Sequence, residues 1–402
     1  MTHVRLRSPF VVCALVLAGL LAACSGAAPG APASPGAGTS WAEANVAQPA
    51  SLVAPWASGS VPAFCSPCHA AIATRMLGVA ADGPSLVAVG MSVPPAYAAA
   101  WLSSDGITWS QAPGLHAAEE SLMTAVAVSP GRIVAVGGVA ALAAAWTSAG
   151  GDTWSSATVT PPSIAGQARM AAVLAWRGGY VAGGDVEPTP SDHHAVLWTS
   201  ADGAAWSPLP DEPAFDGGSV ASLAAGRSRL VAVGTVLDPS GSTRAAAWWS
   251  TDGRSWTAAP VDASFANAQM NGVTAGGPGF VAVGSADDGG SAAAWTSTDG
   301  ERWTRAPDGT GFGGGGLRIA MASVAAGPGG LVAVGSRDDA GNGSPTVWVS
   351  PDGITWRRVP DDPSFGGGLM AAVAVDGMSF VAVGTLGLPD NAIAAAWISG
   401  AR

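Results

Sequence analysis

The stretch AAAWTSTDGERW, residues 292–303, ends one short apolar segment with a tryptophan and starts another segment with a second tryptophan eight residues later. An apolar segment, a turn containing Ser, Asp and Gly, and a second segment are typical of two short β-strands joined by a tight turn. The same spacing recurs along the chain, in the pairs Trp101/Trp109, Trp146/Trp154, Trp198/Trp206, Trp248/Trp256, Trp295/Trp303 and Trp348/Trp356.

A second repeated element, an apolar run that ends in glycine, precedes each of these stretches. It occurs seven times, at residues 86–90, 133–137, 180–183, 230–234, 280–284, 331–335 and 380–384. The period of about 50 residues is that of one four-stranded propeller blade. With an apolar stretch before it and the two tryptophan segments after it, each copy supplies four strands. The sequence therefore predicts an all-β fold, a seven-bladed β-propeller.

The seventh copy ends soon after Trp397 and lacks its fourth strand. Residues 38–41, Gly-Thr-Ser-Trp, resemble residues 106–109, Gly-Ile-Thr-Trp, which start the fourth strand of the first copy. We therefore expect a strand beginning at Trp41 to complete the last blade and leave no open sheet edge. This places the propeller at residues 39–402.

The N-terminus has the features of an export signal. Arg5 and Arg7 precede an apolar run from Pro9 to Ala23 that is short for a membrane span. Its end, residues 21–24 (Leu-Ala-Ala-Cys), resembles the lipobox of bacterial lipoproteins, which implies a signal peptide over 1–23 and lipidation of Cys24. The alternative is an ordinary signal peptide. The Pro/Gly/Ala-rich segment 24–38 is expected to be a flexible tether, so the domain is expected to be extracytoplasmic and anchored to the membrane.

The composition restricts the partners of the domain. The net charge is −11 and every basic residue is arginine, which argues against a nucleic-acid partner. The apolar fraction of 48% is mostly Ala and Val, which suits closely packed sheets. We expect a monomer.

The Ser-x-Asp-Gly turns, such as residues 103–109 and 350–356, resemble the Asp-box (bacterial neuraminidase) repeat of β-propellers. Here Asp and Gly are adjacent, whereas the family has a residue between them, and the copy at 148–154 lacks the Asp at its place. A turn aspartate accepts backbone N–H groups, and glycine adopts positive φ. We expect this structural role, rather than metal binding or catalysis, for Asp105, Asp202, Asp252, Asp299 and Asp352.

Function is expected on the face opposite these turns, which carries more than half of the 28 acidic residues. They include Asp185, Glu187, Asp192, Asp211, Glu212, Asp287, Asp288, Asp338, Asp339, Asp361 and Asp362. These loops either attract cations such as calcium or form a solvated rim. In one loop His193 and His194 follow Asp192; they could bind a metal, with His116 as a further ligand, but we expect an exposed loop pair.

Residues 65–69 read Cys-Ser-Pro-Cys-His, the pattern that attaches c-type haem covalently. Cys65 and Cys68 would then hold the porphyrin, His69 would be the axial ligand, and Met76 or Met91 would be the distal ligand. The alternative, which we expect, is a disulfide between Cys65 and Cys68, as suits an exported domain. No other cofactor is predicted.

The resemblance to sialidases implies an enzymatic alternative, in which arginines bind the substrate and a tyrosine is the nucleophile. Arg75, Arg169 and Arg318 lie at the start of first strands, and the chain has only Tyr97 and Tyr180. No acid–base pair is recognisable, so catalytic residues stay unassigned. We expect a binding or assembly scaffold for a protein or carbohydrate ligand. A cavity lined by Arg, Tyr and carboxylates would favour the glycoside hydrolase, and a cavity lined by Ala and Gly would favour the scaffold.

Overall fold

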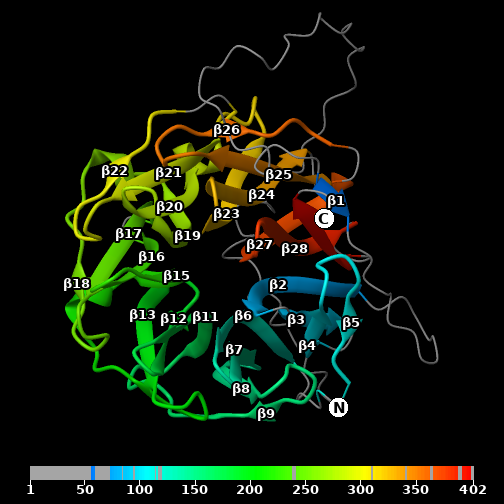
Figure 1. Cartoon of the computed structure of the whole chain (residues 1–402). Helices are drawn as coiled ribbons and strands as arrows, with labels where there is room; N and C mark the ends of the chain where they lie inside the picture. The colour runs from blue at the N-terminus through cyan, green and yellow to red at the C-terminus, as the bar shows by residue number, and fades with distance from the viewer. Residues whose placement is uncertain are drawn as a thin grey trace, which may run out of the picture.

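The computed structural model describes residues 56–58, 73–83, 85–93, 96–113, 115, 120–237, 241–308, 311–339, 342–362, 365–387 and 392–399. This part of the chain forms seven β-sheets around a central axis and contains no α-helix (Figure 1). The predicted seven-bladed β-propeller is confirmed. Within the described ranges, no helix has the length and apolar character needed to cross a membrane.

Each blade is an antiparallel sheet of four strands in sequence order. Blade 1 comprises β2 (Ala73–Asp82), β3 (Ser85–Val93), β4 (Tyr97–Ser103) and β5 (Ser110–Gln111). Blade 2 comprises β6 (Ser121–Ser129), β7 (Arg132–Val139), β8 (Leu142–Ser148) and β9 (Ser155–Ser156). Blade 3 comprises β11 (Gln167–Trp176), β12 (Gly179–Thr189), β13 (Asp192–Ser200) and β14 (Ala205–Pro208), and β10 (Thr158–Val159) adds to it in parallel beside β14.

The remaining blades repeat this order. Blade 4 comprises β15 (Gly218–Ala225), β16 (Leu230–Leu237), β17 (Thr243–Ser250) and β18 (Thr257–Ala258). Blade 5 comprises β19 (Gln269–Gly276), β20 (Gly279–Ala286), β21 (Ser291–Ser297) and β22 (Thr304–Arg305). Blade 6 comprises β23 (Arg318–Gly327), β24 (Gly330–Asp339), β25 (Asn342–Ser350) and β26 (Arg357–Arg358). Blade 7 comprises β27 (Gly368–Asp376), β28 (Ser379–Leu386) and β29 (Ile393–Ser399). Three short 3-10 helices are η1 (Pro213–Phe215), η2 (Ala263–Phe265) and η3 (Asp287–Gly289).

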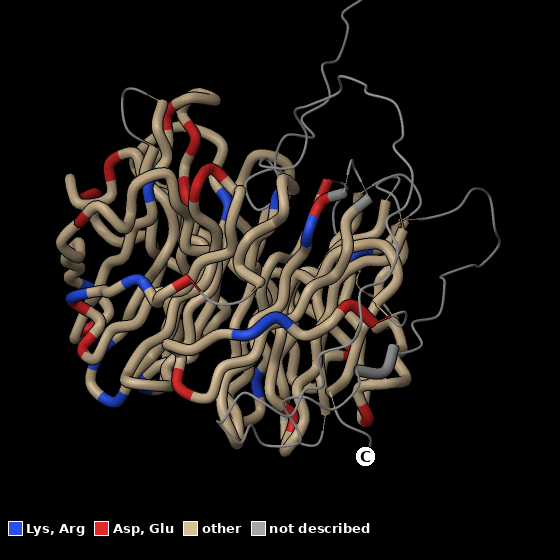
Figure 2. Tube along the Cα trace, turned by 90° about the horizontal axis from the view of Figure 1, so that it is seen from above, with Lys and Arg blue, Asp and Glu red and all other residues tan. Residues whose placement is uncertain are grey.

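The first strand of each blade lies nearest the axis and the fourth lies at the rim (Figure 1). Because successive strands are antiparallel, the connections alternate between the two faces of the ring. One face carries the connections between second and third strands and those between blades, and we call it the loop face. The other carries the Ser-x-Asp-Gly turns, and we call it the turn face. Figure 2 shows the ring from the side, with acidic residues along both edges.

The last blade is completed by an N-terminal strand, as predicted, but from a different segment. Strand β1 (Trp56–Ser58) pairs antiparallel with β29, with Trp56 opposite Ser399 and Ser58 opposite Trp397. In blade 1 the equivalent register places Trp101 opposite Gln111, two residues after Trp109. Trp56 therefore occupies the second-tryptophan position. The expected strand beginning at Trp41 lies outside the described residues, and its assignment as the closing strand was wrong, because β1 occupies that position.

The glycine that ends the apolar run within each second strand is explained by a bulge in the first strand beside it. In all seven blades the pairing of first and second strands shifts by one residue directly after this glycine's partner, as between Met270 and Gly272 opposite Gly284. A Cβ on the glycine would overlap the backbone oxygen of the residue before that partner, Gln269 in blade 5. In blade 3 this position belongs to Gly184, one residue beyond the glycine expected from the sequence, because Arg169 supplies the oxygen there.

The hydrophobic core lies between neighbouring blades. One cluster joins Val231 and Val233 of blade 4 to Met270, Phe280 and Trp295 of blade 5. An equivalent cluster joins blade 1 to blade 7 and so closes the ring. Burying one tryptophan of 150–250 Å² contributes about 4–6 kcal/mol. The tryptophans at both repeat positions are therefore core residues, and those exposed by less than 2% are Trp101, Trp109, Trp198, Trp206, Trp248, Trp295, Trp348 and Trp397.

The Ser-x-Asp-Gly turn is held by hydrogen bonds of the serine, the aspartate and the following tryptophan. In blade 1 the Ser103 hydroxyl accepts from the Gly106 N–H at 2.9 Å, and Gly106 has φ of 71°. Asp105 Oδ1 accepts from the N–H groups of the second and third residues after it, at 2.8 and 2.7 Å. The indole of Trp109 donates to the Gly106 carbonyl at 3.1 Å. These contacts use the aspartate to stabilise the backbone.

The same aspartate contacts recur in four further turns, at Asp202, Asp252, Asp299 and Asp352. Backbone donation from Ser255 and then Arg254 lowers the pKa of Asp252 to about 2. In the divergent second copy, Asp152 Oδ1 accepts from the N–H of Thr153, the residue directly after it, at 2.9 Å. The Ser148 hydroxyl still accepts from the Gly151 N–H there, at 2.7 Å. The serine and glycine thus keep the turn where the aspartate is displaced.

Candidate functional site: the central cavity

A cavity of about 760 Å³ lies on the axis of the ring and is lined by the first strand of every blade. This volume is within the range of small-molecule sites. Most of the lining is Ala, Gly, Ser, Val and Leu, and no aromatic residue of the described ranges contributes to it. Within the described ranges, the lining thus combines the Ala and Gly residues that were expected of a scaffold with two arginines and two carboxylates, but no tyrosine, of the set that was expected of a glycoside hydrolase.

In each first strand, one residue lies directly before the buried Met or Val at which the bulge begins. This position is held by Arg75, Leu122, Arg169, Ser219, Gln269, Ala320 and Leu369. All of them except Arg75 line the cavity. Two residues further along, side chains bind the next blade: the Thr124 hydroxyl donates to the Met170 carbonyl at 2.7 Å and the Asn271 amide donates to the Met321 carbonyl at 2.9 Å. These contacts fix neighbouring first strands around the cavity.

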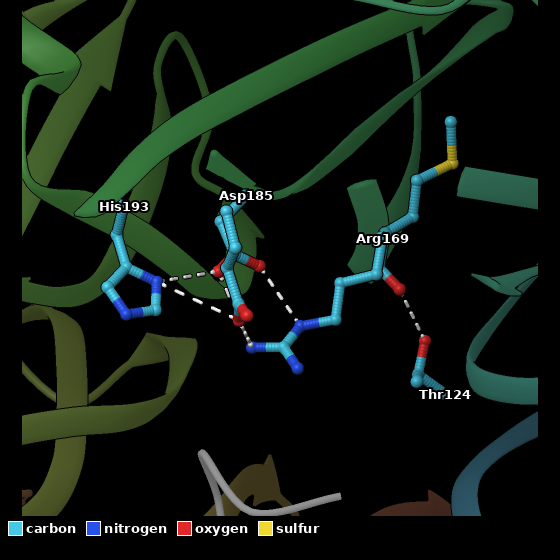
Figure 3. Close-up of polar contacts among 6 residues, drawn as sticks. Thr124, Arg169, Asp185 and His193 are labelled. Atoms are coloured by element: carbon cyan, nitrogen blue, oxygen red, sulfur yellow. Dashed lines mark hydrogen bonds and ion pairs between the residues drawn. The ribbon is translucent and has the colours of Figure 1, made fainter. Parts of the chain in front are cut away.

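A cluster of four charged or titratable side chains lies at the loop-face end of blade 3. Arg169 Nε donates to Asp185 Oδ1 at 3.0 Å, and Arg169 Nη2 lies 3.4 Å from Glu187 Oε1. His193 Nδ1 lies 3.3 Å from Asp185 Oδ2 and 3.8 Å from Glu187 Oε1. Figure 3 shows Arg169 and His193 approaching Asp185 from opposite sides. Arg169, Glu187 and His193 line the cavity.

Strand geometry brings these residues together. Arg169 on β11 pairs directly with Asp185 on β12. Asp185 and Glu187 are two residues apart on one strand, so their side chains project from the same face of the sheet. His193 follows at the start of β13, where the β12–β13 pairing shifts between Val186 and Thr189. Three adjacent strands therefore each contribute to one cluster.

Asp185 is the centre of the cluster and is completely buried. A buried carboxylate has to be paired and hydrogen-bonded, and Arg169 and His193 satisfy this requirement. The hydrogen bond to Asp185 raises the pKa of His193, against the opposing effect of burial, and the charges of Asp185 and Glu187 add to the increase. The cluster therefore holds a well-oriented imidazole at the cavity wall.

His194 lies on the other side of β13 and belongs to a second cluster. Its Nε2 lies 2.6 Å from Asp211 Oδ1 and its Nδ1 lies 3.2 Å from Asp216 Oδ1. His193 and His194 are only 9% and 8% exposed, so the expectation of an exposed loop pair was wrong. Asp192, by contrast, is exposed. The third histidine of that prediction, His116, lies outside the described residues.

A second polar sector of the cavity wall comes from blades 5 and 6. Gln269, Asn271, Asp288 and Arg318 line it. Asp288 has positive φ of 54°, and its N–H donates to the Asn267 carbonyl at 3.1 Å. Of the three arginines singled out from the sequence, Arg169 and Arg318 thus reach the cavity.

Both tyrosines lie away from these groups. Tyr180 is near the turn face, where its hydroxyl is 2.5 Å from the Ser129 hydroxyl and its ring packs on Trp206. Tyr97 begins β4 and is not among the cavity residues. A tyrosine beside an acid and arginines, as the sialidase resemblance would require, is not formed by the described residues.

Several acidic side chains of the loop face are exposed and paired with arginine. Asp361, 54% exposed, lies 3.4 Å from Arg337 and 3.3 Å from Arg358. Asp308, 74% exposed, lies 3.1 Å from Arg305. These pairs fit the solvated rim that we expected as the alternative to a calcium-binding face.

Some predicted sites lie outside the described residues, namely Cys24, Cys65, Cys68 and His69. Of the two methionines considered as distal haem ligands, Met76 is completely buried in the core between blades 1 and 7, and Met91 is 8% exposed.

The Asp185–His193 pair is the part of the site that sequence inspection missed. The strand period was a usable signal, because it places Asp185 and Glu187 on one face of the predicted second strand. The alternation of β13 likewise separates His193 from His194. Loop membership alone does not reveal the contact between Asp185 and His193, because both residues lie on strands.

No protein-family model and no curated protein sequence matches this chain. Solved structures do resemble it. YjhT matches 72% of this chain and 98% of its own, with 10% identity and a TM-score of 0.47. A Trypanosoma rangeli sialidase in complex with 2,3-difluorosialic acid matches 81% of this chain and 54% of its own, with 13% identity and a TM-score of 0.44.

A puromycin hydrolase mutant matches 78% of this chain and 50% of its own, with 14% identity and a TM-score of 0.50. This chain thus spans about half of the sialidase and of the hydrolase. At these identities the likeness concerns the fold alone, and it carries no activity over to this chain.

Proposed function

We propose that this chain is an exported, membrane-anchored binding propeller that takes a small polar ligand into its central cavity through the loop face. The observation that carries the proposal is the wall of the cavity. Small side chains leave about 760 Å³ open, and the charged groups Arg169, Glu187, His193, Asp288 and Arg318 lie in two sectors of the wall. Such a wall would contact a ligand mainly through apolar groups and would orient it through a few polar groups.

A binding role also agrees with the missing nucleophile. The Tyr180 hydroxyl is bonded to Ser129 near the turn face, and Arg169 lies near the loop face of the same blade. A sialidase-like hydrolase would need these groups side by side. Incubation of the full chain with a fluorogenic sialoside is therefore expected to give no turnover. Turnover that Arg169→Ala abolishes would overturn the preference for binding.

Ligand entry is tested by filling the cavity. Ala322 lines it, and Ala322→Trp would occupy part of the open volume; Ala258→Trp, on an exposed fourth strand, is the matched control. The probes are defined neutral and acidic oligosaccharides and di- and tripeptides, measured by thermal shift of the full chain. A ligand at 100 times its Kd stabilises the fold by about 2.7 kcal/mol. We expect a probe that stabilises the wild type and the Ala258 variant but not the Ala322 variant. Equal stabilisation of all three would refute binding in the cavity.

Anchoring rests on the sequence of residues 21–24. Metabolic labelling with an alkyne fatty acid is expected to label the wild type and not Cys24→Ser. Labelling of both proteins, or of neither, would contradict a lipid anchor at Cys24.

A further inference from the structure

We propose that Asp185, Glu187 and His193 form a binding site for a divalent transition-metal ion, with Zn²⁺ as the best match to one imidazole nitrogen and two carboxylate oxygens. The inference does not depend on the organic ligand proposed above, because it concerns three side chains of one blade. Mixed nitrogen and oxygen sets suit Zn²⁺ better than Ca²⁺, which prefers oxygen alone.

The three donor atoms lie close enough together for one ion to gather them. His193 Nδ1 lies 3.3 Å from Asp185 Oδ2 and 3.8 Å from Glu187 Oε1, and all three atoms lie within 4.8 Å of one another. Zinc binds nitrogen and oxygen at about 2.0–2.2 Å, so two ligands of one ion at 90–110° are about 3.0–3.5 Å apart. The His193–Asp185 hydrogen bond has a length within this range. Glu187, whose side chain is 17% exposed, would move a few tenths of an ångström closer to complete the site.

Arg169 orients the two carboxylates. Its Nε donates to Asp185 Oδ1 at 3.0 Å, and its Nη2 lies 3.4 Å from both Asp185 Oδ2 and Glu187 Oε1. Outer partners of this kind fix the orientation of metal ligands. Asp185 is completely buried, so water cannot solvate its negative charge. A bound cation would compensate this charge instead. With neutral imidazole, the two carboxylates and Arg169 sum to one negative charge, which favours a divalent cation.

The remaining coordination positions face the cavity, since Glu187 and His193 both line it. Three protein ligands with an open position are the arrangement of reactive zinc sites rather than of closed structural ones. A bound ion would therefore be accessible to a ligand in the cavity.

The neighbouring His194 cluster has a different geometry and supplies the control. Its two carboxylates lie at different ring nitrogens, Asp211 at Nε2 and Asp216 at Nδ1. One donor atom of each of these three side chains also lies within 4.8 Å of the others. The two close contacts, at 2.6 and 3.2 Å, are nevertheless made at different ring nitrogens, whereas a single nitrogen of His193 faces both of its carboxylates. His194→Gln thus removes an equally buried histidine of the same strand without removing a ligand.

The test is titration of the metal-depleted full chain with Zn²⁺ by isothermal calorimetry. Every protein carries serine in place of all four cysteines, Cys13, Cys24, Cys65 and Cys68, because thiolates bind zinc themselves. We expect one Zn²⁺ per chain. His193→Gln and Glu187→Gln should each weaken binding by at least about 100-fold, and His194→Gln should leave it within about threefold.

Absence of stoichiometric binding, or equal loss in the His193 and His194 variants, would overturn the proposal. Glu187 lies at the edge of the network with a 17% exposed side chain, so Glu187→Gln serves if the His193 variant does not fold. As a second readout, Co²⁺ added to the Cys-free protein should give the visible absorption of a nitrogen- and oxygen-bound ion. The Glu187 variant should lose this absorption, and its retention there would count against the site.

Discussion

Gly137→Ala is the most informative single perturbation of the fold, because it tests the bulge that builds the cavity wall. Gly137 ends the apolar run of β7, opposite the bulge between Met123 and Ala125. A Cβ on residue 137 would lie 2.1 Å from the backbone oxygen of Leu122. Real Cβ atoms stay at least 3.0 Å from other heavy atoms, so the overlap is about 1 Å. Backbone cannot rotate away as a flexible side chain can, so β6 and β7 have to separate.

The magnitude follows from the ladder between these strands. A separation of about 1 Å stretches hydrogen bonds of about 2.9 Å beyond 3.5 Å, where they no longer count. Losing two or three such bonds costs about 0.5–1.5 kcal/mol each, and burying the freed groups adds to that. Overpacked cores lose a further 1–3 kcal/mol. We expect a loss of about 3–5 kcal/mol.

The assay is urea unfolding of Gly137→Ala beside Gly138→Ala. Gly138 is the next residue of the same strand and is also buried, yet its added Cβ would meet nothing closer than 3.4 Å. With an m-value of about 3 kcal/mol/M, the first variant should lower the midpoint by about 1 M or more. The second should change it by less than about 0.3 M. Equal shifts would refute the bulge as the reason for the glycine.

Three further predictions concern the site and the turns. Asp185→Ala should lower the stability of the metal-free chain by about 3–5 kcal/mol, measured by urea unfolding, because it removes the closest carboxylate of the buried Arg169 and leaves only the longer contact to Glu187, at 3.4 Å; a loss below 1 kcal/mol would show that the pair is not buried in solution. Tyr180→Phe should cost only about 1 kcal/mol in the same assay, the value of its hydrogen bond to Ser129, and should not change probe binding in the cavity; weaker probe binding would place Tyr180 in the site. The pKa of Asp252 is lowered to about 2 from an ordinary 3.8, so its contribution is complete above pH 4 and is lost as the pH falls towards 2. The melting temperature of the wild type should therefore fall over this range, and Asp252→Asn should fall less steeply; parallel curves for the two proteins would contradict the assigned shift.

The sequence by itself determined the number of blades, the strand order and the turns. These features are local: each strand has its own apolar pattern, and each turn its own Ser, Asp and Gly, so seven repetitions made the pattern unambiguous. The closing strand was placed at Trp41 instead of Trp56 because residues 38–40, Gly-Thr-Ser, match the repeat and the apolar residues 52–55 before Trp56 do not. Only the pairing with β29 identifies Trp56. The glycine of blade 3 was misplaced by one residue for the same reason.

Only the tertiary structure decided what lies at the cavity. Arg169, Asp185, Glu187 and His193 come from three strands, and their meeting depends on the register of β11, β12 and β13 and on the shift in each pairing. A register shift of one residue would turn each side chain to the opposite face of the sheet. His193 and His194 are chemically identical in the sequence, and strand alternation directs the first to the cavity and the second to Asp211 and Asp216. The chain specifies the residue types, but contacts between strands determine which residues share a site.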